Sequence, residues 1–277
     1  MPHFDLHCHT TCSDGKLSPQ GLINLALESN ITHLAITDHD TVAAHRQLKP
    51  IDNLGLKLIS GIELSSQWSK IGIHIVGLNI NINSDAILKA EAHLNAVRMQ
   101  RLERIAYKLE KRGFNNILEG ACGEAGDNQV GRPHIARYMV KQGMVNSVSA
   151  AFDKYLGAGK VGDVSSLWPA LADTVQWINE AGGVAVIAHP GRYKLTRSKR
   201  IRMIEDFKDA GGQALEVCTG NQPHGMSEDL ANICERYELM ASVGSDFHSP
   251  DYPWVKLGRY PRLPKKCRPV WESLGLF

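Results

Sequence analysis

Two histidines near the start of the chain, His7 and His9, are separated by a single residue in the stretch Asp-Leu-His-Cys-His at positions 5–9. Side chains two residues apart in a β-strand point to the same side, so an extended segment aims both imidazoles at one point. Imidazole nitrogens are common ligands of divalent transition metals. Alone, the pattern is also typical of a polar strand surface. Its meaning therefore depends on whether the fold brings further ligands to this strand.

Candidate ligands recur at the places where later apolar runs give way to Gly, Pro or polar residues, and six of the 12 histidines fall in the whole set. The later positions are Asp38, His39, Glu63, His74, His189, Asp246 and His248. Mixed imidazole and carboxylate donors suit Zn, Mn or Fe. The chain must then fold so that segments far apart in sequence meet at one metal site.

The bulk properties describe a globular chain with no strong charge bias. With 277 residues, 43% of them hydrophobic, the chain can form one large α/β domain or two small ones. The formal net charge of +2 is too small to indicate nucleic-acid binding by bulk charge. The six cysteines contain no Cys-x-x-Cys pair, and we expect them to be reduced.

The chain shows no leader-like start and no apolar run of membrane-spanning length. We therefore expect a cytoplasmic protein that does not contact a membrane. No feature indicates an obligate protein partner.

Seven short segments have the apolar character of strands, and several are continuous runs typical of buried parallel strands. They are Phe4–His7, His33–Thr37, Lys57–Ile62, Ile73–Ile80, Val184–His189, Ala214–Val217 and Leu239–Gly244. Helical patterns lie between them, namely residues 18–27, Arg200–Ala210 and Met226–Tyr237. The alternation predicts a closed or nearly closed parallel α/β barrel with its site at the carboxyl ends of the strands. A doubly wound open sheet is the alternative.

Residues 84–168 interrupt this alternation, which predicts a helical subdomain inserted into a barrel made of residues 1–83 and 169–277. The insertion opens with a long helix, Asp85–Arg112, that carries one apolar stripe. Its other face carries Arg98, Arg101, Arg104, Lys108, Lys111 and Arg112. Such a face is either solvated or able to follow the phosphates of a nucleic acid.

The order and spacing of the candidate ligands resemble the PHP (polymerase and histidinol phosphatase) family. Three further sequence motifs are similar to those of the branch of nucleoside 3',5'-bisphosphate phosphatases and 5'-to-3' exoribonucleases typified by ribonuclease AM. These motifs are Gly-Leu-Asn-Ile at 77–80, Gly-Arg-Pro-His at 131–134 and His-Pro-Gly-Arg-Tyr at 189–193. The resemblance implies a distorted seven-stranded (β/α) barrel, similar to a TIM barrel, with two or three divalent metal ions. Mn is the first choice for these ions, and Zn or Fe are alternatives.

The resemblance also implies how the ligands are shared. His7, His9, Glu63 and Asp246 would hold one ion. Asp14 and His39 would hold a second ion, with Glu63 bridging the two. His74, His189 and His248 would hold a third. Glu63 and Asp246 would thus be catalytic through the ions.

Several residues next to these ligands are expected to assist them. Asp38 is expected to hold a ligand histidine in the right tautomer, although it could instead cap a helix. Arg132, His134 and Arg192 are expected to grip a substrate phosphate, with Lys160 a weaker candidate. Arg132 could instead simply begin a helix, and Arg192 could be a surface residue. Positions 163–166, Asp-Val-Ser-Ser, depart from the aromatic-valine-proline run of the branch.

A phosphate ester repels hydroxide, so its hydrolysis requires charge neutralisation and a nucleophile available at neutral pH, and clustered metal ions supply both. The resemblance therefore implies a phosphoesterase acting on a nucleoside 3',5'-bisphosphate or trimming 5'-monophosphorylated RNA. A phosphatase for a small metabolite such as histidinol phosphate is the alternative enzyme. A non-catalytic, metal-stabilised nucleotide-binding module is the alternative of another class, but such a module should have lost ligands.

Overall fold

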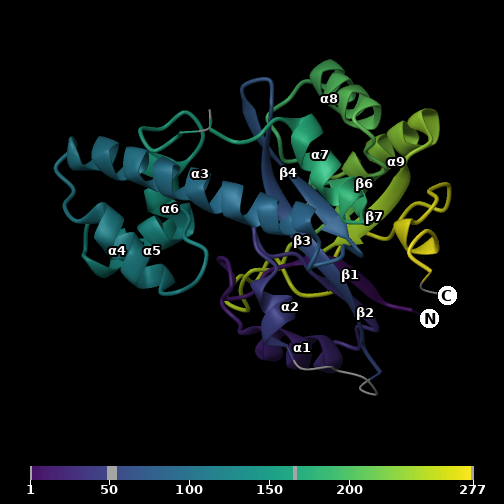
Figure 1. Cartoon of the computed structure of the whole chain (residues 1–277), viewed down its shortest axis with the longest axis horizontal. Helices are drawn as coiled ribbons and strands as arrows, with labels where there is room; N and C mark the ends of the chain where they lie inside the picture. The colour runs from purple at the N-terminus through teal and green to yellow at the C-terminus, as the bar shows by residue number, and fades with distance from the viewer. Residues whose placement is uncertain (1, 49–54, 165–166, 276–277) are drawn as a thin grey trace.

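The computed structural model describes residues 2–48, 55–164 and 167–275. Figure 1 shows a strand-rich body and a smaller lobe of helices to one side, which the long helix α3 connects. The described part contains no helix with the length and apolarity needed to cross a membrane. All six cysteines have free thiols, as expected.

Seven strands form one sheet, in which each strand neighbours the next along the chain. They are β1 (Phe4–Cys8), β2 (His33–Ile36), β3 (Lys57–Trp68), β4 (Ile71–Leu78), β5 (Val184–Ile187), β6 (Ala214–Thr219) and β7 (Met240–Gly244). The sheet curves until its two edges approach each other. The Asp246 N–H donates to the carbonyl of His7 (2.8 Å), and the His9 N–H donates to that of Phe247 (2.9 Å). The predicted barrel is therefore nearly closed.

The prediction that all strands are parallel is wrong for one strand. β4 runs antiparallel to both β3 and β5. Only Ser69 and Lys70 separate β3 from β4, and a link this short permits a hairpin but no crossover helix. β3 continues six residues beyond its predicted end at Ile62, as far as Trp68. This hairpin is one distortion of the barrel.

Helices cover the outside of the barrel, with α1 and α2 below the sheet in Figure 1 and α7, α8 and α9 above it. Their bounds are α1 (Pro19–Glu28), α2 (Ala43–Gln47), α7 (Leu171–Glu180), α8 (Arg197–Asp209) and α9 (Met226–Tyr237). α1 begins as predicted, because the Ser18 hydroxyl accepts a hydrogen bond from the Gly21 N–H. A 3-10 turn, Val270–Glu272, follows β7 near the end of the described chain.

The helical lobe follows β4 and has a hydrophobic core of its own. It consists of α3 (Asp85–Glu110), α4 (Ile117–Ala125), α5 (Arg132–Lys141), α6 (Val148–Ala151) and a π-helical turn (Phe152–Leu156). α3 serves both cores: Ile87 and Leu94 pack into the core of the barrel, and Leu102 and Leu109 pack into that of the lobe. The long helix thus fixes the lobe beside the barrel. The bounds 84–168 of the insertion remain a prediction.

Candidate active site

The candidate ligands come from several strands of the nearly closed barrel and from the segments that follow them. β1 carries His7 and leads into His9, and the loop after it carries Asp14. His39 follows β2, His189 follows β5, and Asp246 and His248 follow β7, whereas Glu63 and His74 lie within β3 and β4. All nine predicted positions lie in three groups or next to one of them.

The first group contains His7, His9, Glu63 and Asp246, all of them buried. Nε2 of each histidine lies 3.3 Å from Glu63 Oε2. The distances from the same atoms to Asp246 Oδ1 are 3.4 Å for His7 and 3.2 Å for His9. Two imidazoles and two carboxylates therefore converge on one point, in the combination that the sequence predicts.

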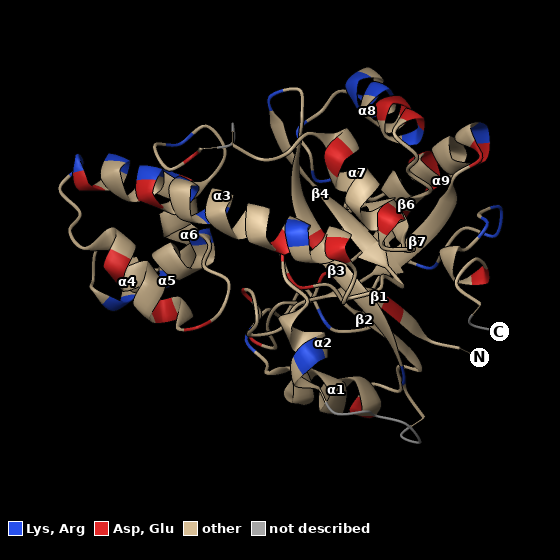
Figure 2. Ribbon diagram, viewed as in Figure 1, with Lys and Arg blue, Asp and Glu red and all other residues tan. Residues whose placement is uncertain are grey.

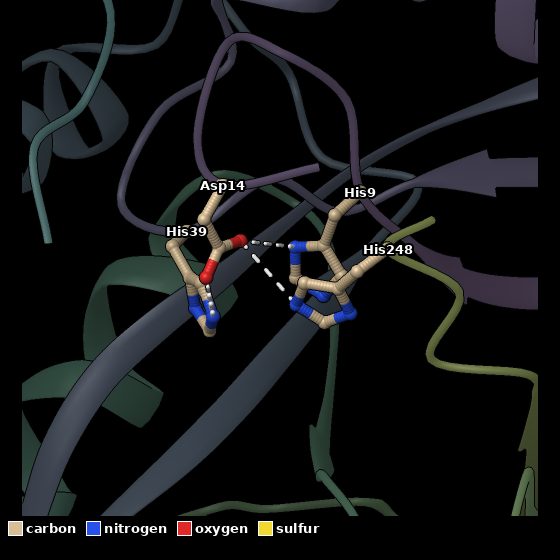
Figure 3. Close-up of side chains that lie close together, drawn as sticks. All are labelled: His9, Asp14, His39 and His248. Carbon is tan, nitrogen blue, oxygen red and sulfur yellow. Dashed lines mark ion pairs between the residues drawn. The ribbon is translucent and has the colours of Figure 1, made fainter. Parts of the chain in front are cut away.

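The second group contains His9, Asp14, His39 and His248 (Figure 3). Asp14 is central to it. Its Oδ1 lies 3.3 Å from His248 Nε2, and its Oδ2 lies 3.8 Å from His39 Nε2. The structure thus places His248 with Asp14 and His39, whereas the sequence grouped it with His74 and His189.

The third group contains His39, Glu63 and His74. Glu63 Oε1 faces His74 Nδ1 at 2.9 Å and His189 Nε2 at 3.1 Å. Its other oxygen, Oε2, faces His39 Nδ1 at 3.0 Å and the histidines of the first group. The two oxygens of one carboxylate therefore face different sets of imidazoles, which is the arrangement expected for a bridging ligand.

The buried polar atoms of these groups fit divalent metal ions. Among the described residues, seven buried side-chain nitrogen and oxygen atoms of these groups have no hydrogen-bond partner: His7 Nε2, His9 Nδ1, His9 Nε2, Asp14 Oδ1, His39 Nδ1, Glu63 Oε2 and His189 Nδ1. A buried polar atom without a partner costs about 1–3 kcal/mol. Ligation of a cation would satisfy such atoms, and imidazole with carboxylate is a suitable donor set. The site is therefore a candidate metal-binding cluster.

The charges of the cluster stabilise one another even without an ion. Burial by itself would lower the pKa of His9, but the carboxylates of Asp246 and Glu63, 3.2 and 3.3 Å from its Nε2, raise that pKa to about 10. Burial would likewise raise the pKa of Asp246, but the charges of His7 and His248 hold it well below its usual range. Without an ion, these carboxylates therefore favour the protonated form of His9.

Two of the candidate ligands have a strained backbone. His189 (φ 32°) and Asp246 (φ 53°) both lie in the left-handed region, which is sparsely populated by residues other than glycine. The His189 N–H donates to Glu216 Oε2 at 2.6 Å, and the Asp246 N–H donates to the carbonyl of His7. The surrounding structure thus holds both residues in conformations of a kind that clusters at functional sites.

Asp38 does not hold a histidine, and that prediction is wrong. Its carboxylate accepts hydrogen bonds from the Thr10 N–H (2.8 Å), the Thr10 hydroxyl (2.6 Å) and the Ser13 hydroxyl (2.5 Å). Asp38 therefore stabilises the turn between His9 and Asp14 by hydrogen bonds, and so positions both candidate ligands through the backbone.

A hollow of about 600 Å³ opens above the cluster. Asp14, His39 and His74 form part of its floor. The helical lobe contributes Arg98, Arg101, Arg132, Pro133 and Phe152, and the barrel rim contributes Lys70, Arg192, Tyr193 and Lys194. The hollow therefore joins the candidate metal cluster to cationic side chains from both lobes.

Two of the four expected phosphate contacts line this hollow, Arg132 and Arg192. His134 is buried and accepts the Gly131 N–H at Nδ1 (3.1 Å), and burial together with the nearby Arg137 lowers its pKa to about 4. It is therefore a neutral cap of α5. Lys160 lines a different hollow, with Lys108, Lys111 and Arg112. Of positions 163–166, Asp163 reaches the main hollow, whereas Ser165 and Ser166 lie outside the described residues.

The family model of the PHP domain matches residues 5–182 of the chain. The chain belongs to the PHP family. Both the family resemblance and the distorted barrel that it implied are thus confirmed.

Relatives of known description match over nearly the whole chain. The 5'-3' exoribonuclease Rnm of Escherichia coli (strain K12) is 41% identical over 272 residues, which span 97% of this chain and 92% of that protein. The 3',5'-nucleoside bisphosphate phosphatase of Chromobacterium violaceum is 37% identical over 276 residues, 99% of this chain and 97% of that protein. The solved structure of a C. violaceum amidohydrolase with bound sulfate and no metal has a TM-score of 0.91 and 37% identity, and covers 99% of this chain and 96% of that one.

Sequence reasoning missed two arginines that shape the hollow of this PHP protein. The helix face of Arg98 and Arg101 was expected to be solvated or to follow nucleic acid, but Arg101 is only 8% exposed and Arg98 is half-buried. Arg98 donates to Asp40 Oδ2 (2.5 Å) and to the Ser65 hydroxyl (3.1 Å). Arg104 and the basic residues after it on this face are exposed, as a solvated face would be. The amphipathic pattern of α3 did not reveal that the barrel covers part of its polar face.

Sequence reasoning also missed Glu216, which lies next to two ligands of the PHP cluster. Its Oε1 is 3.0 Å from His7 Nδ1, and its Oε2 accepts the His189 N–H. Glu216 thus takes the role that was predicted for Asp38. A signal was present, because Glu216 is the one charged residue in the apolar run Ala214–Thr219.

Proposed function

We propose that this chain is a metal-dependent phosphoesterase that hydrolyses the 3'-phosphate of nucleoside 3',5'-bisphosphates and trims 5'-monophosphorylated RNA from its 5' end. One observation carries the proposal: a single hollow joins the candidate metal cluster to a group of buried and half-buried guanidiniums in the helical lobe. A substrate with two phosphates can place one over the cluster and the other against the arginines. The names of the E. coli and C. violaceum relatives support the same substrate class.

The guanidinium group consists of Arg98, Arg101 and Arg132. Burial, together with the charges of Arg132 and Arg98, lowers the pKa of Arg101 to about 9. Burial also lowers the pKa of Arg132. Only Arg98 has a carboxylate within ion-pair distance among the described residues. Because these cations repel one another at one end of the hollow, a bound phosphate dianion would stabilise them.

At the cluster, the proposed reaction is a displacement at phosphorus. The oxygen of a water molecule bonds to phosphorus, the bond from phosphorus to the 3'-oxygen breaks, and the 3'-oxygen leaves as a hydroxyl after it takes up a proton. Two or three divalent ions, Mn²⁺ by preference and Zn²⁺ or Fe²⁺ otherwise, would lower the pKa of a bound water to about 7 and stabilise the attacking and leaving oxygens. The three groups around Glu63, Asp14 and Asp246 would hold these ions.

Other side chains prepare the site for this step. Arg192 donates to Asp246 and to the carbonyl of Gly220, so its guanidinium stays beside the cluster and faces the hollow. Asp38 keeps the turn that carries His9 and Asp14 in place. Arg192 offers positive charge to the scissile phosphate. The proposed step requires no nucleophilic side chain, because water is the nucleophile.

The experiment that tests this function compares adenosine 3',5'-bisphosphate with adenosine 3'-monophosphate. We expect phosphate release from the bisphosphate, and a kcat/KM at least roughly tenfold lower without the 5'-phosphate, since a charge-assisted hydrogen bond contributes about 1.5–3 kcal/mol. Arg132→Ala should lower kcat/KM on the bisphosphate by a similar factor and barely distinguish the two substrates, and Arg132→Lys should fall between. Arg104→Ala, an exposed change on α3, is the control.

These measurements form a double-mutant cycle. Additive effects of the substitution and the missing phosphate would remove Arg132 from the 5'-phosphate site. No phosphate release from the bisphosphate, with release from histidinol phosphate instead, would overturn the proposed function.

Metal content gives a second prediction. Protein purified without chelator should contain two or three divalent ions per chain by elemental analysis, and a maximum of one after incubation with Mn²⁺ would contradict the shared-ligand arrangement. Ligand histidines must be neutral, so protons compete with metal as the pH falls. Occupancy should therefore drop below about pH 6, where unperturbed imidazoles become protonated. Equal occupancy after equilibration at pH 5 and pH 7.5 would contradict histidine ligation.

A further inference from the structure

The hollow above the cluster has two different ends. Toward the helical lobe it is enclosed, because Arg101 is 8% exposed and the Trp168 ring lies against the guanidiniums of Arg98 and Arg101 (5.4 and 5.2 Å to the ring centroid). Toward the barrel rim it is lined by Lys70 and Lys194, and both side chains are exposed to solvent. A terminal nucleotide fits an enclosed end. A continuing chain requires an open one.

Both lysines are attached to segments that carry candidate ligands. Lys70 immediately precedes β4, and the four residue steps from Lys70 to His74 span about 13 Å of extended chain. Lys194 lies in the segment after β5 that begins with His189. The hydroxyl of Tyr193 accepts the His74 N–H (2.8 Å) and donates to the carbonyl of Ala188 (3.0 Å). These bonds fix the Lys194 segment against β4.

Within the part of the chain that the structure describes, the charges at this rim are not neutralised. In the described ranges no carboxylate lies within ion-pair distance of Lys70 or Lys194. Other cations nearby are already paired: Arg192 with Asp246, and Arg197 with Asp229 at 2.9 Å. Asp206, an acidic neighbour of the β3–β4 turn, accepts the indole N–H of Trp68 at 2.6 Å. The two lysines are thus available to bind an anion at the open end of the hollow.

We propose that Lys70 and Lys194 bind the phosphates of the RNA chain on the 3' side of the scissile bond. This inference rests on the proposed function and refines its substrate class. The 5'-terminal nucleotide occupies the enclosed end with its 5'-phosphate at the guanidiniums, the next phosphate lies over the cluster, and the remaining chain leaves across the open rim. The exposed basic residues of α3 lie beyond the 5'-phosphate end, where a chain threaded in this direction has no further phosphates (Figure 2).

The test compares a 5'-phosphorylated pentaribonucleotide with adenosine 3',5'-bisphosphate, using wild type and the double variant Lys70→Ala, Lys194→Ala. The ratio of kcat/KM for the pentanucleotide to kcat/KM for the bisphosphate should fall roughly tenfold in the double variant, because only the longer substrate has phosphates at the rim. The slope of log kcat/KM against log salt for the pentanucleotide should become shallower by about 1.4, the value for two single-strand phosphate contacts. The matched control is Lys108→Ala, Lys111→Ala, which removes two exposed lysines at the C-terminal end of α3.

The outcomes separate this inference from the function on which it rests. Failure of the wild type on both substrates would overturn the proposed function. A double variant with an unchanged ratio would overturn the inference alone. A wild type that hydrolyses the bisphosphate but not the pentanucleotide would overturn the inference together with the RNA-trimming part of the proposed function. A ratio that falls in the α3 control and not at the rim would route the RNA along α3 and overturn it as well.

Discussion

Glu63→Gln should reduce kcat on adenosine 3',5'-bisphosphate by about three orders of magnitude. Both oxygens of Glu63 are used: Oε2 lies 3.0–3.3 Å from nitrogens of His7, His9 and His39, and Oε1 lies 2.9 Å from His74 Nδ1. An amide offers one neutral oxygen in place of two that share a negative charge. Metal-assisted charge stabilisation contributes several kcal/mol, and each 1.4 kcal/mol is about tenfold in rate.

The measurement is steady-state kcat together with metal content of the same preparation, and a thermal unfolding curve shows that the variant is folded. Glu180→Gln, at the end of α7 and remote from the hollow, is the matched control and should retain wild-type activity. Full activity of Glu63→Gln with normal metal content would place Glu63 outside the cluster.

The barrel was predictable because its signal is local. Short apolar runs alternate with amphipathic helices, and each run reports its own burial. The direction of a strand has no such local signal, which is why β4 was expected to be parallel. The chain did contain the needed clue, since β3 and β4 are joined through Ser69 and Lys70 alone. Because β3 was predicted to end at Ile62, the prediction did not include this short link.

The residues of the candidate cluster were predictable from the sequence, but their grouping was not. Each ligand stands at or near a strand end and has a recognisable side chain. Which ligands meet depends on distances between strands that are far apart in sequence, so His248 was placed with His74 although it lies beside Asp14. The burial of Arg101 was hidden for a similar reason, because it arises only when Val164 and Trp168 pack back onto α3.

Glu216 shows how a residue outside the ligand set can control it. It is 2% exposed, and one carboxylate joins the ring of His7 to the backbone of His189. Acceptance of the Nδ1 proton of His7 leaves Nε2 free to face Glu63 and Asp246. Gly244 leaves room for this contact, since a Cβ there would lie 2.3 Å from the Cβ of His7 and 3.0 Å from Glu216 Oε1.

Glu216→Gln should therefore weaken metal binding by about 10- to 100-fold, the usual cost of losing a group that orients a ligand histidine. The amide keeps the shape of the side chain, but its NH₂ cannot accept from His7 or from the His189 N–H. A positioning role predicts that excess Mn²⁺ restores much of the kcat and that KM for the bisphosphate stays near the wild-type value. Glu216→Asp, which keeps the charge on a shorter side chain, should lose less affinity than Glu216→Gln.

The measurement is the metal dissociation constant by titration into chelator-treated protein, followed by kcat at low and at saturating Mn²⁺. Glu205→Gln is the control, because this α8 carboxylate contacts only the exposed hydroxyl of Tyr237 among the described residues. Wild-type metal affinity in Glu216→Gln would show that His7 is oriented without it. A loss of kcat that excess metal leaves uncorrected would instead mean that Glu216 acts on the chemical step, because a residue that only orients His7 and His189 has no effect once the ions are bound.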